Sequence, residues 1–187
     1  MLIWRSAHFA TALACIAASA SAQNILTNPG FETGSLAGWT TSGFTTTNDS
    51  NSGNWAAFSN DSFWVRQDFA PVAATLVTEV SVWSKQQNLS NYFYTFVLRY
   101  GDGSLDSVLP SGSSTGVFVK HDFTSSLDLS KTLAGIEAWG YTTNNTNVDF
   151  TTHDDFVVNV VPEPATGLVL LGGLAFAALR RRKKAIA

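Results

Sequence analysis

The sequence predicts one antiparallel β-sandwich, expected as a jelly roll, between two apolar end segments. Three observations lead to this fold class. From residue 23 to residue 160, short runs of Val, Phe, Trp, Tyr and Thr alternate with Ser, Thr, Asn and Gly, which is typical of strands and turns. This stretch has no sustained helical periodicity and no repeat of about 20 to 50 residues. The length of 187 residues suits one domain with short appendages.

Alternation and turn residues place the individual strands. Val80 and Val82 should point to one face of their strand and Trp83 to the other. The expected strands cover residues 77–84, 91–100, 117–124, 134–141 and 153–161. The Thr- and Asn-rich stretches at 40–54 and 142–152 are expected to be exposed loops.

Residues 1–22 are predicted to be a secretory signal peptide. Arg5 supplies a positive charge, an apolar stretch follows, and Ala20-Ser21-Ala22 offers the small residues that signal peptidase requires. The apolar stretch is too short to span a bilayer of about 30 Å. We therefore expect cleavage after Ala22. The single cysteine, Cys15, lies in this segment, so the processed chain has no thiol chemistry; a lipoprotein box at Cys15 is the less favoured alternative.

The C-terminal segment, residues 161–187, has three parts in a fixed order. Pro162-Glu163-Pro164 ends the preceding strand, because proline cannot donate to a β-ladder. Residues 165–179 are apolar or small apart from Thr166 and are expected to form a transmembrane helix of about 22 Å. A basic cluster then stops transfer and stays on the cytoplasmic side: Arg180, Arg181, Arg182, Lys183 and Lys184.

These three parts resemble the PEP-CTERM sorting signal of Gram-negative bacteria that make exopolysaccharide. The resemblance implies that an exosortase, a membrane cysteine protease, removes the tail. It also implies that the helix holds the protein in the inner membrane before processing, and that the protein then reaches the cell surface or the extracellular space. The alternative is an ordinary tail anchor.

The distribution of charge narrows the partners of the central domain, residues 23–160. Between residues 23 and 164 the chain carries five basic and 14 acidic side chains, a net charge of −9. Phosphate binding requires clustered Lys and Arg. The sequence therefore argues against nucleic acid and is compatible with neutral glycans or divalent cations.

A second resemblance concerns the ends of the domain. The opening Asn28-Pro29-Gly30-Phe31-Glu32 with Gly38-Trp39, and the closing Asp154-Asp155, are similar to those of galactose-binding-like, carbohydrate-binding-module jelly rolls. The resemblance implies a structural Ca²⁺ ion held by Glu32 and one of Asp154 or Asp155, with backbone carbonyls. Only one aspartate should reach the ion, since successive strand residues face opposite sides. The alternative is that these are surface carboxylates without an ion.

Three aromatic residues are candidates for contact with a glycan. Trp83, Trp139 and Tyr141 occupy the polar faces of their predicted strands, where an aromatic ring can stack on a sugar. Trp39 is expected in the core. The alternative is that all of these rings serve packing.

Enzymatic signatures are weak. Asp154 and Asp155 are adjacent on a strand and so cannot form the facing carboxylate pair of a glycosidase. His121 is expected at the surface, and the chain has no Gly-x-Ser-x-Gly or His-Glu-x-x-His motif. The sequence thus predicts a non-catalytic surface or matrix protein that binds exopolysaccharide. The alternatives are a purely structural, self-assembling protein and, with less support, a polysaccharide hydrolase or lyase.

Overall fold

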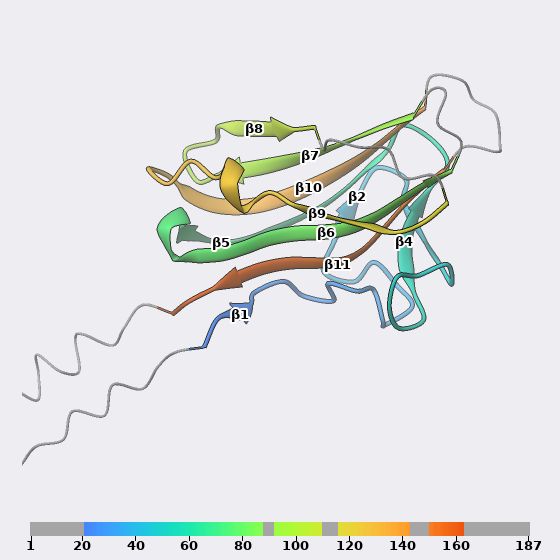
Figure 1. The fold of residues 1–187 in the computed structure, drawn as a ribbon, viewed down its shortest axis with the longest axis horizontal. Coiled ribbons are helices and arrows are strands. Elements are labelled where there is room, and N and C mark those ends of the chain that lie inside the picture. Colours follow the sequence, from blue (N-terminus) through green and yellow to red (C-terminus); the bar gives the residue numbers. More distant parts are fainter. Residues whose placement is uncertain (1–20, 88–91, 110–115, 143–149, 163–187) are drawn as a thin grey trace, which may run out of the picture.

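The computed structural model describes residues 21–87, 92–109, 116–142 and 150–162, which form a sandwich of two antiparallel sheets (Figure 1). The strands are β1 (Gln23–Asn24), β2 (Thr40–Thr41), β3 (Thr45–Thr47), β4 (Ala56–Ser59), β5 (Trp64–Ala73), β6 (Val77–Gln87), β7 (Tyr92–Tyr100), β8 (Leu105–Val108), β9 (Val119–Asp122), β10 (Thr132–Thr142) and β11 (Phe150–Val160). Two short 3-10 segments, η1 (Ala74–Leu76) and η2 (Thr124–Ser126), join strands of the two sheets.

The strand order is that of a jelly roll, which confirms the predicted fold class. One sheet runs β3-β4-β11-β6-β9, with β1 also paired to β11, and the other runs β2-β5-β10-β7-β8. Of the last eight strands, four lie in each sheet, in the orders β4-β11-β6-β9 and β5-β10-β7-β8. This is the arrangement of a jelly roll, which is built from two Greek keys. We call these the six-stranded and the five-stranded sheet.

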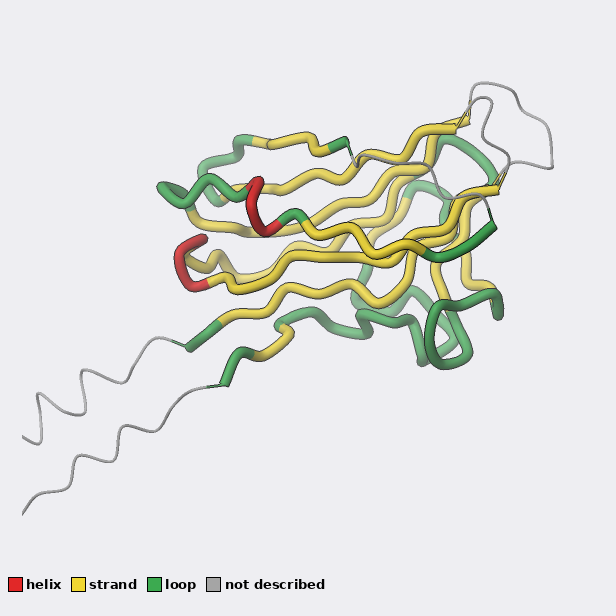
Figure 2. Tube along the Cα trace, viewed as in Figure 1, coloured by secondary structure: helices red, strands yellow, loops and turns green. Residues whose placement is uncertain are grey.

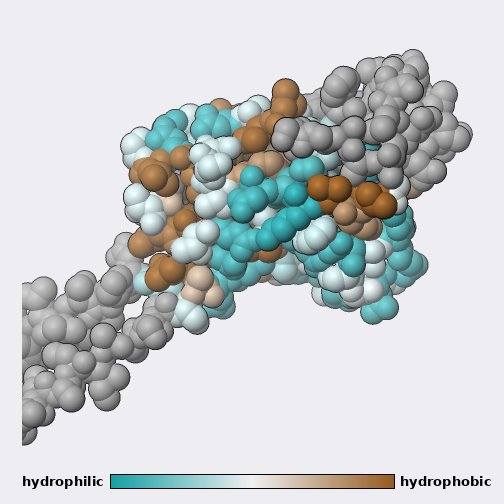
Figure 3. All heavy atoms as spheres, in the orientation of Figure 1, coloured by the Kyte–Doolittle hydropathy of each residue, from teal (hydrophilic) through white to brown (hydrophobic). Residues whose placement is uncertain are grey.

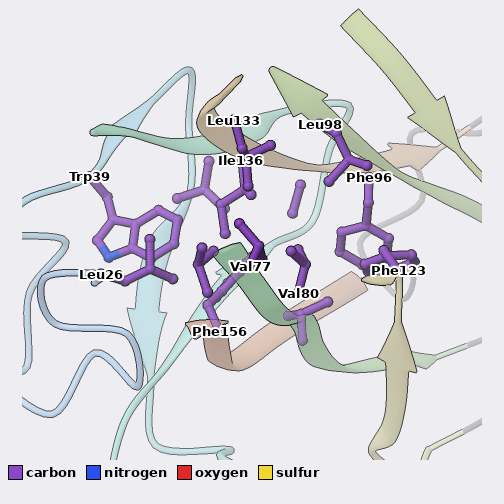
Figure 4. Close-up of a cluster of buried hydrophobic side chains, with 14 of the residues drawn as sticks. Leu26, Trp39, Val77, Val80, Phe96, Leu98, Phe123, Leu133, Ile136 and Phe156 are labelled. Atoms are coloured by element: carbon purple, nitrogen blue, oxygen red, sulfur yellow. The ribbon is translucent and has the colours of Figure 1, made fainter. Parts of the chain in front are cut away.

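The core lies between the sheets and follows the alternation of the long strands (Figure 4). Val80 and Val82 of β6 are buried in it, as are Ile136 and Ala138 of β10. Trp39 is also buried there, as predicted, and packs on Phe31 and Phe156 with ring centroids 5.3 and 4.7 Å away. The opening motif therefore packs directly against the closing strand.

Three parts of the structure depart from the sequence-based expectation. The stretch 40–54, expected to be loop, contains the short edge strands β2 and β3, and Thr151 and Thr152 are buried within β11. Strand β5, which contains Pro71, was not among the expected strands. Pro71 lies where the pairing of β5 with β10 is irregular, between Gly135↔Asp68 and Leu133↔Val72, so no ladder hydrogen bond is required of it.

The two ends of the sandwich differ in what they carry. Gln23 pairs with Val160, so both termini leave the domain side by side at the end that also carries the two 3-10 segments (Figures 1 and 2). We call this the terminal end. Trp64 and Trp139 pair at the start of β5 and late in β10, which places them toward the opposite end.

On the face seen in Figure 3, apolar side chains lie in groups toward the edges, and hydrophilic side chains cross the centre. The most exposed large apolar residues are Leu105, Leu109, Val117, Val119 and Leu129. Among the residues that the structure describes, no helix has the length and apolar character needed to cross a membrane. The predicted signal peptide and the predicted helix at 165–179 lie outside the described residues.

Candidate functional site

Three carboxylates meet the loop formed by residues 48–55. Glu32, in the turn that follows the positive-φ residue Phe31 (φ 57°), accepts hydrogen bonds from the backbone N–H groups of Asn54 (2.9 Å) and Trp55 (3.1 Å). Asp154 accepts from the backbone N–H groups of Asn51 (2.7 Å) and Ser52 (3.2 Å). The carboxylates thus hold the loop against the opening turn and the closing strand.

Asp155 also faces this loop, which corrects the expectation that the two aspartates point to opposite sides. Its carboxylate accepts from Asn51 Nδ2 and Ser52 Oγ, both at 2.8 Å. The reason is a β-bulge: the pairing of β11 with β6 shifts between Asp154 and Val157, and Asp155 has φ 46°. A bulge inserts an extra residue and breaks the alternation of side chains.

The carboxylates of Asp154 and Asp155 lie close together beside the opening turn. A Cβ atom placed on Gly30 would lie 3.2 Å from Asp155 Oδ1 and 3.7 Å from Asp154 Oδ1, so both aspartates crowd the opening turn. Burial raises the pKa of Asp154 to about 6, with the charge of Asp155 adding to the shift, while the N–H donors of the loop lower it. The cost of an ionised, desolvated carboxylate is only partly offset by its hydrogen bonds.

The fit of this cluster to calcium has two sides. In the described part of the chain, Glu32, Asp154 and Asp155 accept hydrogen bonds from amides and a hydroxyl. These donors carry no charge that would neutralise the carboxylates. Against this, in the described part of the chain no three Asp, Glu, His or Cys side chains are grouped so that they could hold a metal ion. Calcium at this cluster therefore stays a prediction.

The second candidate site lies on the outer face of the five-stranded sheet. Trp64 and Trp139 are cross-strand neighbours on β5 and β10, and both are half-buried. Their ring centroids are 6.3 Å apart with planes at 49°. Because Val65 and Ala138 point into the core, the two tryptophans point outward.

A network of charged side chains adjoins the two tryptophans. Glu137 accepts hydrogen bonds from Trp139 Nε1 and, at 3.2 Å, from an Arg99 guanidinium N–H. Arg66 lies 5.1 Å above the Trp64 ring and 3.9 Å from Glu137. Asp68 forms ion pairs with both arginines, 3.0 Å from Arg66 Nε and 3.2 Å from Arg99 Nε. We define the five-stranded face as Trp64, Arg66, Asp68, Arg99, Glu137 and Trp139.

The structure separates the aromatic residues that the sequence grouped together. Trp83 lies on β6 of the six-stranded sheet, where Asp154 and Lys120 are its pairing partners. Trp139 lies on β10 of the other sheet. The expectation of a single platform from Trp83 and Trp139 is therefore wrong, since the two belong to outer faces of different sheets. Tyr141 continues β10 opposite Phe93, and its side chain lies outside what the structure describes.

The two histidines of the domain are buried, which corrects the expectation for His121. His121 Nε2 lies 2.7 Å from the Tyr94 hydroxyl, and His153 Nδ1 lies 2.8 Å from Ser84 Oγ. Burial lowers the pKa of His121 and lowers that of His153 to about 3. Ser84 and His153 are both fully buried, so this hydroxyl–imidazole pair has no access to a polymeric substrate.

Trp64 and most of the polar residues of the five-stranded face were missed at the level of sequence. Trp64, Arg66 and Asp68 alternate along β5, which was the available signal. Arg99 and Glu137 occupy the outward positions of β7 and β10, and only the pairing of these strands with β5 brings them together.

Comparison with known families locates one motif. The profile of the PEP-CTERM protein-sorting motif matches residues 160–183. The chain carries a PEP-CTERM sorting motif. Such a motif implies export and membrane-anchored processing by an exosortase. Comparison with curated proteins gives no match.

Comparison with solved structures supports the fold. The carbohydrate-binding module TmCBM61, solved in complex with β-1,4-galactotriose, is 22% identical with a TM-score of 0.51, over 72% of this chain and 97% of that one. The CBM22-1 xylan-binding domain of Paenibacillus barcinonensis Xyn10C is 15% identical with a TM-score of 0.42, over 77% and 98%. The enzymatically active domain of tailspike protein 4 from bacteriophage CBA120 is 15% identical with a TM-score of 0.48, over 72% and 21%. The sandwich thus shares the fold of TmCBM61.

Proposed function

We propose that the protein is sorted to the cell surface through its PEP-CTERM motif and that its sandwich binds exopolysaccharide without cleaving it. The five-stranded face is the proposed binding surface. The observation that carries this proposal is the pairing of two outward, half-buried tryptophans beside a charged network of the buried Glu137, the half-buried Arg66 and Arg99, and the exposed Asp68.

The chemistry of this face suits a sugar chain. The indole rings offer apolar surface for the C–H face of a pyranose ring. Arginine N–H groups and carboxylate oxygens, held by one another at 3.0–3.2 Å, supply donors and acceptors for hydroxyls at fixed positions. Two cations and two carboxylates balance, which favours an uncharged glycan over a polyanion.

The position of the five-stranded face is compatible with anchoring of the domain through its C-terminal tail. The tail leaves from the terminal end, and Trp64 and Trp139 lie toward the opposite end. A domain anchored through residues 165–179 would therefore present the tryptophans away from the membrane.

Titration of residues 23–161 with neutral oligosaccharides and with the producer's own exopolysaccharide tests this proposal. We expect Trp139→Ala and Trp64→Ala to weaken binding roughly tenfold or more, a loss of about 1.4 kcal/mol or greater. Trp83→Ala, on the other sheet, is the matched control and should bind as the parent domain does. Equal losses from Trp83→Ala and Trp139→Ala, or no binding by the folded parent domain, would contradict the proposal.

Calcium is the second part of the proposal. Glu32 with Asp154 or Asp155 would hold the ion, which would supply charge neutralisation and rigidity to the loop at 48–55. The support is this group of carboxylates, whose hydrogen-bond donors in the described part of the chain are amides and a hydroxyl. We expect added CaCl₂ to raise the melting temperature of the parent domain and to leave that of Glu32→Gln unchanged. Equal responses to CaCl₂ and MgCl₂ in both proteins would count against a specific site.

Two alternatives make different predictions. A purely structural, self-assembling domain would bind no glycan and would associate at rising concentration in sedimentation experiments. A hydrolase or lyase would release reducing ends from a polysaccharide, and that release would disappear on substitution of a single carboxylate or histidine.

A further inference from the structure

The last strand is held on both of its sides up to its final residue. Val160 is buried and pairs with Val77 of β6 on one side and with Gln23 of β1 on the other. Val161, one residue beyond the strand, still donates a backbone hydrogen bond of 2.9 Å to the Leu76 carbonyl. The folded domain therefore extends through Val161.

Strand β1 is short, yet its asparagine side chain prolongs its contact with β11. Asn24 Oδ1 accepts hydrogen bonds from the backbone N–H groups of Leu26 (3.2 Å) and Val158 (3.1 Å). Asn24 Nδ2 donates to the Phe156 carbonyl (2.9 Å), and the Ile25 N–H donates to the Val158 carbonyl (3.0 Å). We call this group of contacts the Asn24 clamp.

The sorting motif begins inside this held region. Its match to the family profile starts at Val160, the last residue of β11. Pro162 is exposed and has no N–H group, so it cannot prolong the ladder. A single residue thus separates the hydrogen-bonded Val161 from Glu163.

This spacing conflicts with the way in which a protease binds its substrate. Proteases and other peptide-binding proteins take an extended segment as an added strand, through its backbone N–H and C=O groups. Pro162 is preceded by residues 158–161, whose backbone already bonds to β1, β6 or η1. Binding of these residues by the protease requires the end of β11 to leave the sheet first.

We propose that the tail is cut C-terminal to Val161 and that the rate of this cut is limited by local opening of the end of β11, with the Asn24 clamp opposing it. This inference rests on the proposed sorting through the PEP-CTERM motif and on the exosortase processing that such a motif implies. The cut breaks one peptide C–N bond of this chain. The carbonyl carbon is transferred to the cysteine sulfur of the exosortase as a thioester, and the leaving nitrogen takes a proton. Water then resolves the thioester to a carboxylate and restores the thiol.

Pulse labelling of the full-length chain in the bacterium that produces it, with the tail scored by its mass, measures the processing rate. We expect Asn24→Ala to be processed roughly fivefold faster, because the clamp loses its side-chain hydrogen bonds. A flexible Gly-Ser spacer of about six residues between Val161 and Pro162 should have at least as large an effect. Asn48→Ala, which removes one hydrogen bond to the Asn54 carbonyl far from Val161 along the fold, is the matched control and should leave the rate unchanged.

A reversible lock tests the same point in the other direction. Gln23 and Val160 are Cα partners in an antiparallel pair, a separation that a disulfide can bridge. We expect the double variant Gln23→Cys, Val160→Cys to be processed severalfold more slowly when oxidised and at the parent rate when reduced. The reduced form controls for any effect of the substitutions on the fold.

Mass spectrometry of the released product tests the position of the cut. We expect a C-terminus at Val161 or beyond, with β11 intact. A product that ends before Val161, or equal rates for the parent, Asn24→Ala and spacer chains, would overturn this inference and leave the processing itself in place. A spacer that slows the cut would overturn it in favour of a protease that docks on the folded end. A parent chain that keeps its tail would overturn the processing and the inference together.

Discussion

The two sheets of the sandwich use their charged and polar residues in different ways. The five-stranded sheet carries charge on its outer face, where Arg66, Arg99 and Glu137 surround two tryptophans. The six-stranded sheet instead buries His153 and Asp154, which are adjacent on β11 and fully enclosed. We therefore assign the proposed glycan binding to the five-stranded sheet and expect the response of stability to pH to come from the six-stranded sheet.

The largest effect is expected from His153. Its pKa of about 3 in the folded state lies below the ordinary value of 6.5, so between these values only the unfolded state binds the proton. Stability through this group is therefore present above pH 6.5 and falls by about 1.4 kcal/mol for each pH unit below it. We expect His153→Phe to remove this part of the slope in urea titrations from pH 6.5 to 4. An unchanged slope would show that the imidazole is protonated in the fold.

Asp154 should act in the opposite direction and over a narrower range. Its pKa of about 6 exceeds the ordinary value of 3.8, so between these values only the folded state holds the proton. Rising pH then costs stability, by about 1.4 kcal/mol per unit between roughly pH 4 and 6. Urea titrations of Asp154→Asn should show stability rising more steeply with pH than the parent over that interval. A shallower rise would contradict a buried Asp154 carboxylate whose desolvation is only partly offset by its hydrogen bonds.

The two sheets can also be compared through their ion pairs. Glu137 is 7% exposed and contacts two arginines and the Trp139 indole, so Glu137→Ala should cost about 2 kcal/mol. Glu79, on the other sheet, pairs with the exposed Lys120 at 2.7 Å, and Glu79→Ala should cost at most about 1 kcal/mol. Urea denaturation at pH 7 measures both. A reversed order would contradict the structural role assigned to the network on the five-stranded face.

Sequence alone was sufficient for the fold class and for the sorting motif. Alternation in residues 77–84 and the turn residues after Tyr100 located long strands, and the order of motif, apolar run and basic cluster identified the sorting motif. Strand β5 was not predicted, although Trp64, Arg66 and Asp68 alternate along it; its Pro71 is accommodated where the pairing with β10 is irregular. The facing of Asp155 could not be predicted either, since a β-bulge reverses alternation without a signal in residue type.

The candidate binding face was predictable only in part. Trp139 was named from the alternation of its strand, and Trp83 was named by the same reasoning. Strand order, a property of long-range pairing, decides which tryptophan has Trp64 and the two arginines beside it. Local patterns cannot contain that information, because residues 64 and 139 meet only through the pairing of β5 with β10.

The most direct test of the account is to follow the indole N–H signals of the folded domain by NMR while a neutral oligosaccharide of the producer's exopolysaccharide is added. We expect the Trp64 and Trp139 signals to shift with a common saturation curve. For Trp139 the reason is that its indole N–H donates a hydrogen bond to Glu137 within the proposed binding face. The Trp83 signal should stay in place. Shifts confined to Trp83, or shared equally by all three, would contradict the assignment of glycan binding to the five-stranded face.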